Sequence, residues 1–206
     1  MARKDPRRFF CIKIHLFAYY IIIYKQRYGG LFLKRDISLW QWIGFGVTAA
    51  GGTLLHFLYE WTGESVIASL VSGVNESTWE HMKLMFFPMF IFALIQRRFF
   101  KDHASFWCVK LIGVLTGLTL IPIFFYTYNG VLGKSPDWVN ISIFFISAAL
   151  AFLLENRLFK KGSGECKWNK AAFILICIIG ILFIVFTFIP PRIPLFEDPV
   201  TGQYGI

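Results

Sequence analysis

Long runs of apolar residues, separated by short polar segments, dominate the chain. Four of these runs are long enough to cross the hydrocarbon layer of a membrane, which takes about 20 helical residues. A fifth run carries Glu80, His81 and Lys83 in its first turns and is apolar from residue 84 to residue 95. The pattern predicts an all-α fold, a polytopic membrane helix bundle with five transmembrane helices at residues 39–61, 79–100, 106–128, 138–159 and 171–189.

The apolar run at residues 9–24 is shorter, is interrupted by Lys13 and His15, and has basic clusters on both sides. Since positively charged flanks stay in the cytoplasm, a spanning helix could not satisfy both clusters. A helix that lies in the membrane interface, with basic residues against anionic headgroups, avoids this conflict. We therefore expect an N-terminal interfacial helix within a basic amphipathic extension at residues 1–37.

Composition and charge support a membrane class, because 56% of the residues are hydrophobic and only 16% are charged. With five spans and a cytoplasmic N-terminus, the basic residues between spans fall in the inner loops and the acidic residues fall mainly outside. This asymmetry predicts a multi-pass protein of the cell membrane with its C-terminus outside. The net charge of +9 then follows from topology, and we expect the lipid bilayer, and no nucleic acid, as partner.

Residues 38–206 are expected to form a single transmembrane domain with an outer tail at residues 190–206. Pro190 and Pro191 end the last helix, and the tail that follows is too rich in proline and glycine to continue it. Apolar residues in the tail favour a lid over the site described below, and a disordered tail is the alternative. The residues expected to act as lid or auxiliary ligands are Lys83, Glu197, Asp198 and Tyr204.

Small residues recur every four positions in the first predicted span, at Gly44, Thr48 and Gly52. Such a stripe permits close approach of a neighbouring helix, and it offers a face for a homodimer. The same spacing continues to His56 and Glu60, which therefore share one side of the helix. The pair suits two ligands of one metal, or equally the polar tips of an aromatic belt at the membrane surface.

The segment that follows concentrates further polar groups near the start of the second span. Glu76 and Glu80 are four residues apart, and His81 adds an imidazole beside them. Ser77 and Glu80 also match a capping box, in which Glu80 would only return to the Ser77 amide and start the helix. The ammonium of Lys83 would oppose metal binding by neutralising the carboxylates. The predicted polar site comprises His56, Glu60, Asn75, Glu76, Glu80 and His81, with a divalent metal as cofactor on His56, Glu60, Glu76 and His81.

The four cysteines predict no disulfide framework and no thiolate metal cluster. Cys11, Cys108 and Cys166 are expected on the cytoplasmic side, and Cys177 within the last span. Kinks are expected at Pro88 and Pro122, where they could open a cavity between helices.

Three segments, HFLYEW, VNESTWEHMKL and the terminal PPRIPLFEDPVTGQYG, resemble a domain-of-unknown-function family of small bacterial membrane proteins over about residues 38–206. The resemblance implies membrane localisation and a helical architecture, and it transfers no catalytic residue. An outward-facing polar site then leaves three functions open. The protein could be a membrane hydrolase with a metal or acid/base cluster, a small transporter of a cation or solute, or a structural membrane subunit.

Overall fold

The computed structural model describes residues 36–101, 103–162 and 164–206. The chain divides into two compact units, residues 1–39 and residues 40–206. The architecture given below is that of the second unit. The interfacial helix predicted at residues 9–24, and Cys11, lie outside the described residues.

The described part of the chain is helical, which confirms the all-α prediction. It contains no strand, and the nearest approach to one is an isolated antiparallel bridge between Glu197 and Tyr204. The helical segments are residues 36–61, α2 (Val66–Ser69), α3 (Thr78–Arg97), α4 (Phe106–Leu132), α5 (Asp137–Lys161) and α6 (Asn169–Phe188).

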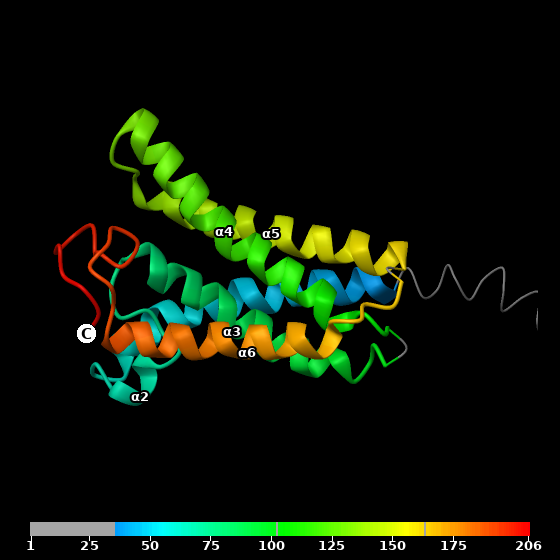
Figure 1. The fold of residues 1–206 in the computed structure, drawn as a ribbon. Coiled ribbons are helices and arrows are strands. Elements are labelled where there is room, and N and C mark those ends of the chain that lie inside the picture. The colour runs from blue at the N-terminus through cyan, green and yellow to red at the C-terminus, as the bar shows by residue number, and fades with distance from the viewer. Residues whose placement is uncertain (1–35, 102, 163) are drawn as a thin grey trace, which may run out of the picture. The chain divides into compact units, whose positions relative to one another are not determined.

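Helix α3 packs against α4, α5 and α6, while α4 and α5 form a long antiparallel hairpin (Figure 1). The buried side chains at the centre are mostly aromatic and aliphatic, and Met85 and Phe86 of α3 are fully buried there. Pro88 lies inside α3 and Pro122 inside α4, as the sequence indicates. A proline leaves the carbonyl four residues earlier without its helical partner, and a Cβ atom added at Gly52 would lie 3.1 Å from that oxygen, which belongs to Leu84.

Three of the helices in the described residues, α4, α5 and α6, are long and apolar enough to cross a membrane. Helix α3 and the helix of residues 36–61 are not among them, so the structure supports three of the five predicted spans. In α3 the reason is its polar first two turns, which hold Glu80, His81 and Lys83. Large apolar side chains are exposed along the spans, for example Ile112, Ile146 and Ile181, as expected for contact with lipid.

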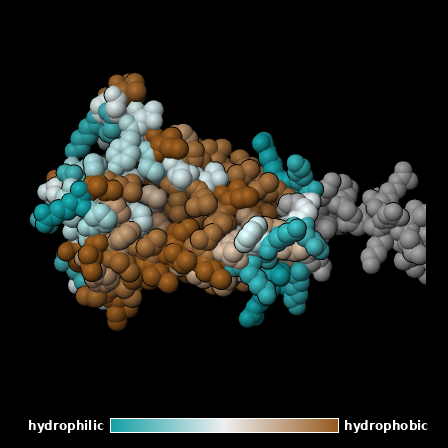
Figure 2. Space-filling view, viewed as in Figure 1, coloured by the Kyte–Doolittle hydropathy of each residue, from teal (hydrophilic) through white to brown (hydrophobic). Residues whose placement is uncertain are grey.

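One face of the second unit shows a broad apolar surface between two hydrophilic ends (Figure 2). At one end, Trp107 and Cys108 of α4 donate backbone hydrogen bonds to Asn169 at the start of α6. We call this the basic end, because eight basic residues belong to the segments that meet there: Arg97, Arg98, Lys101, Arg157, Lys160, Lys161, Lys167 and Lys170. At the opposite end, the C-terminal tail packs on the start of α3, and we call this the tail end.

The homodimer predicted through the small-residue stripe is wrong for this face, because the stripe is occupied within one chain. A Cβ atom added at Gly44 would lie 2.5 Å from the Phe152 ring and 2.6 Å from the Phe92 ring. Thr48 is fully buried. The close approach that small residues allow is thus used to seat the first helix on α3 and α5.

The prediction that the cysteines form no disulfide is also wrong. Cys108 of α4 and Cys166, just before α6, are joined by a disulfide with a Cα–Cα distance of 6.6 Å. The two residues are 58 positions apart, so only the folded hairpin of α4 and α5 brings them together. Cys177 is a free cysteine, as expected.

Candidate functional site

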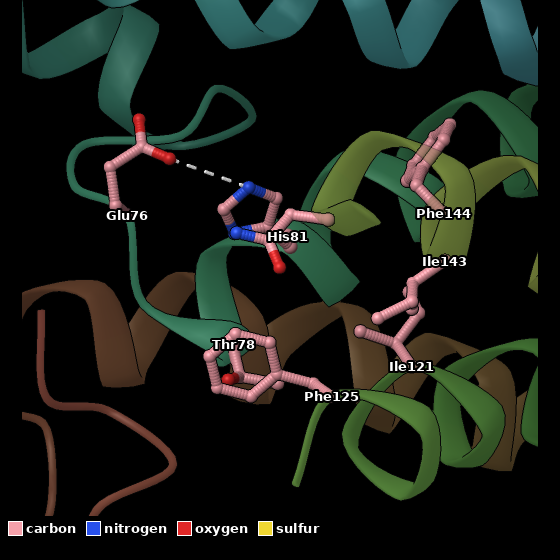
Figure 3. Close-up of a pocket in the computed structure, with 8 residues that line it drawn as sticks. Glu76, Thr78, His81, Ile121, Phe125, Ile143 and Phe144 are labelled. Atoms are coloured by element: carbon pink, nitrogen blue, oxygen red, sulfur yellow. Dashed lines mark ion pairs between the residues drawn. The ribbon is translucent and has the colours of Figure 1, made fainter. Parts of the chain in front are cut away.

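Three of the predicted site residues meet at the tail end, from segments that are separate in the sequence. His56 comes from the first helix, Glu76 from the loop before α3, and His81 from the first turns of α3. Each offers one ligand atom, and these three atoms lie within 4.8 Å of one another. His81 and Glu76 face each other, and both line a pocket between α3, α4 and α5 (Figure 3). The structure thus places His56 and His81 on either side of Glu76.

The start of α3 is built from the residues that flank this cluster. Ser77 is the N-cap, and its hydroxyl accepts a hydrogen bond from the Glu80 amide, as the capping box predicts. The return arm of the box is different, since the Ser77 amide donates to the Asn75 side chain and not to Glu80. Asn75 thus takes the place of Glu80 in the cap, and its own amide group donates to the Gly205 carbonyl in the tail.

A hydrogen bond to the Ser77 carbonyl fixes the proton of the neutral His81 ring. Nδ1 of His81 lies 2.9 Å from that carbonyl oxygen, which can only accept, so Nδ1 carries the hydrogen and donates it. The lone pair then lies on Nε2, which is 3.5 Å from Oε2 of Glu76. Two groups that both accept hydrogen bonds therefore face each other, and a proton or a cation between them would relieve their repulsion.

The distances in the cluster are close to, and in part longer than, those between ligands of one metal ion. Tetrahedral coordination with metal–ligand bonds of about 2.0–2.2 Å places neighbouring ligand atoms about 3.3–3.6 Å apart. Oε2 of Glu76 lies 3.5 Å from His81 Nε2, and Oε1 of Glu76 lies 3.7 Å from His56 Nε2, so the two histidines face different oxygens of one carboxylate. The side chains are 34% exposed for His56, 49% for Glu76 and 23% for His81, so an ion can reach all three from solvent.

Glu60 and Glu80, also predicted for the site, are placed elsewhere. Glu60 is exposed, one turn beyond His56, and is not part of the cluster. Glu80 is buried, and its carboxylate lies 2.5 Å from the Lys83 ammonium. The ammonium also donates to the Thr187 hydroxyl and to the Ser69 carbonyl. Lys83 is therefore held by Glu80 and the last turn of α6. The expectation that its ammonium would oppose metal binding at the cluster is not supported.

The C-terminal tail folds back onto the start of α3. The Trp79 amide donates to the Leu195 carbonyl, and the Trp79 ring packs on Phe196 with the ring centres 4.6 Å apart. Thus the apolar residues of the tail anchor it.

The polar residues of the tail, however, do not join the cluster. Asp198 accepts hydrogen bonds from Val200 and Thr201 within its own turn. Tyr204 donates to Glu197 at 2.9 Å, which raises the pKa of the Tyr204 phenol because the bond favours its protonated form. These three side chains stabilise the tail itself.

A second buried ion pair, which was not predicted from the sequence, lies near the basic end. Lys110 of α4 donates to Glu155 of α5 at 2.6 Å, and both side chains are almost completely buried. The ammonium lies 5.4–5.9 Å from the centres of four phenylalanine rings, those of Phe92, Phe106, Phe152 and Phe159. The signal was present in the sequence, because Lys110 and Glu155 are charges inside apolar runs that were read only as spans.

Comparison with known proteins identifies one relationship. No curated protein and no solved structure matches the chain. A model of a protein family matches residues 32–206, which include every described helix and the His56, Glu76 and His81 cluster. The chain therefore belongs to a family of unknown function, DUF6512.

Proposed function

We propose that this protein is a metal-binding membrane protein whose metal is held by His56, Glu76 and His81. The observation that carries the proposal is the orientation of His81, whose hydrogen bond to Ser77 leaves the Nε2 lone pair facing the Glu76 carboxylate. Metal-bound histidines commonly donate their second ring nitrogen to a backbone carbonyl in this way. His56 completes a set of three ligands on one solvent-accessible face.

The ligand set favours zinc, and it also suits iron or manganese. Two imidazoles and one carboxylate are the ligands of several catalytic zinc sites, and the same combination holds non-haem iron. A three-ligand site keeps a further position for water or substrate, whereas a structural zinc site is closed by four protein ligands. A metal held here would lower the pKa of bound water and so support hydrolysis, which is the activity we propose.

In the membrane, we propose the five-span arrangement with the basic end in the cytoplasm and the metal site outside. The support is the distribution of charge, since the eight basic residues of the basic end contrast with acidic residues around the tail end. The small residues of the helix at residues 36–61 pack against α3 and α5, and α3 packs against α4, α5 and α6. These contacts would let both helices cross the membrane together with their neighbours. Residues 1–37 are proposed to lie along the inner surface as a basic interfacial segment.

Elemental analysis of the purified full chain tests the metal site. We expect about one zinc, iron or manganese ion per chain in the wild type, and loss of that metal in His56→Ala and in His81→Ala. Protons compete with the metal for the imidazole nitrogens, so the metal should also be released as the pH falls.

Glu60→Gln is the matched control, because Glu60 is one helical turn from His56 but outside the cluster. This variant should keep its metal. A wild-type protein that binds none of these metals after incubation with each would contradict the proposal, as would equal loss of metal in Glu60→Gln. Circular dichroism and size-exclusion chromatography would separate loss of a ligand from loss of the fold.

A further inference from the structure

We propose that the metal site takes a carboxylate ligand with a short apolar chain, and that Asn140 of α5 is the residue that orients it. This inference rests on the proposed metal site and names the class of molecule that would occupy its open position. It follows from the pocket next to the cluster, from the hydrogen bonds that fix Asn140, and from the charge of the pocket lining.

The pocket shows on which side of the cluster the open position lies. Glu76 and His81 form part of its lining, whereas His56 does not. A metal held by the three residues would therefore present its remaining position toward the pocket. The opposite wall comes from α4 and α5 and is apolar, with Ile121, Phe125, Ile143 and Phe144 (Figure 3).

A chain of hydrogen bonds leaves Asn140 as a donor in this wall. Asn129 donates from its side-chain amide to the Ser135 hydroxyl at 3.3 Å, and the Ser135 hydroxyl in turn donates to Oδ1 of Asn140 at 2.7 Å. The Ser135 amide is also held by Asn129, at 2.8 Å, which fixes the position of the serine. With its oxygen occupied, Asn140 can offer its amide hydrogens to a ligand in the pocket.

The chemistry of the lining selects among anions. A ligand on the metal needs an oxygen with negative charge, and Asn140 supplies a neutral donor for a second oxygen. Among the described residues that line this pocket there is no Arg or Lys, while Glu76 brings a negative charge. A singly charged carboxylate is therefore favoured over a doubly charged phosphate. The free volume of the pocket is about 20 Å³, enough for about one water-sized group, so an attached alkyl chain would lie along the open side of the apolar wall.

The test uses the full-length protein loaded with Co²⁺, whose visible absorption reports on ligands at the metal. Acetate, butyrate, hexanoate and inorganic phosphate are titrated separately. We expect affinity to rise about fourfold for each methylene that reaches the apolar wall. Phosphate should bind more weakly than acetate, and tighter binding of phosphate would overturn the choice of carboxylate.

Two variants connect the binding to the named residues. Asn140→Leu should weaken every carboxylate about tenfold, the loss expected for one hydrogen bond to a charged group, with unchanged cobalt content. Phe125→Ala should reduce the gain per methylene, whereas Ile123→Ala, at an exposed position of the same helix, should not. An Asn140→Leu variant with wild-type affinity, or affinity independent of chain length, would overturn the inference.

The carboxylate could reach the site from water or from the membrane, and the two sources are distinguished by a parallel titration of oleate in nanodiscs. Binding of hexanoate from water, or of oleate from the bilayer, supports the inference and identifies the source. If neither perturbs the cobalt spectrum, the inference fails. Failure of the metal site itself appears earlier and separately, as protein that retains no cobalt.

Discussion

The buried pair Lys110 and Glu155 permits a sharp test of how the bundle is held together. Removing one partner leaves the other charge buried without compensation, because Lys110 is 1% exposed and Glu155 is fully buried. Breaking such a pair costs about 3–5 kcal/mol in the free energy of unfolding. For a protein of this size, each kcal/mol shifts the melting temperature by about 2–4 °C, so the loss corresponds to about 6–20 °C. Lys110→Met and Glu155→Leu should each show it.

The double variant with both substitutions should recover most of the loss. Methionine and leucine would then pack among the four phenylalanine rings around the ammonium, and replacement of a whole buried pair by apolar residues is often neutral or stabilising. Thermal unfolding in detergent, followed by circular dichroism, measures all three variants. Lys170→Met serves as the control, because Lys170 is exposed, and it should change stability by less than about 0.5 kcal/mol. If the two single losses simply add in the double variant, the two residues are not coupled and the reasoning is wrong.

Two further predictions concern the packing of α4 and the orientation of the chain. Gly113→Ala should lower the unfolding free energy by about 1–3 kcal/mol, because the added Cβ would overlap the Glu155 carboxylate, whereas Gly130→Ala in open space on the same helix should be neutral or stabilising; equal effects in a denaturation experiment would contradict this. A topology reporter fused after Ile206 should be active only outside the cytoplasm, and one fused at Gly162 only inside; the reverse pattern would show that the basic end is outside.

Much of the helical architecture could be predicted from apolar runs alone. The predicted spans at residues 106–128, 138–159 and 171–189 correspond to α4, α5 and α6, with ends that differ by at most four residues. The largest difference is at the end of α4, which continues to Leu132 through Asn129 and Gly130. Polar residues in the last turns of a helix are invisible to a search for hydrophobic runs, since they add no apolar length.

For the candidate site, the sequence predicted only those groupings that follow from the spacing of residues close together in the chain. Residues four apart share a helix face, and this rule grouped His56 with Glu60. The rule says nothing about which neighbour the face meets, and the structure places Glu76 beside His56 while Glu60 remains exposed. For Lys83 the local partner Glu80 was correct, but the hydrogen bond to Thr187, 104 residues away, required knowledge of the tertiary fold.

The disulfide and the charge distribution indicate opposite orientations of the chain in the membrane. Cys108 and Cys166 lie at the basic end, and disulfides persist mainly in oxidising compartments outside the cytoplasm. Basic residues in short loops, however, hold those loops in the cytoplasm. The two indications differ in kind, because the charges act on the chain while it inserts, whereas the cysteines can bond only after the hairpin of α4 and α5 has brought them together. If the charges set the orientation, as proposed above, the compartment then decides whether the two cysteines are bonded or carry free thiols. In the proposed orientation the disulfide between Cys108 and Cys166 would face the reducing cytoplasm, so the bond is an observation against that orientation, and the reporter fusions decide between the two. In either orientation the hydrogen bonds from Trp107 and Cys108 to Asn169 hold the start of α4 against α6.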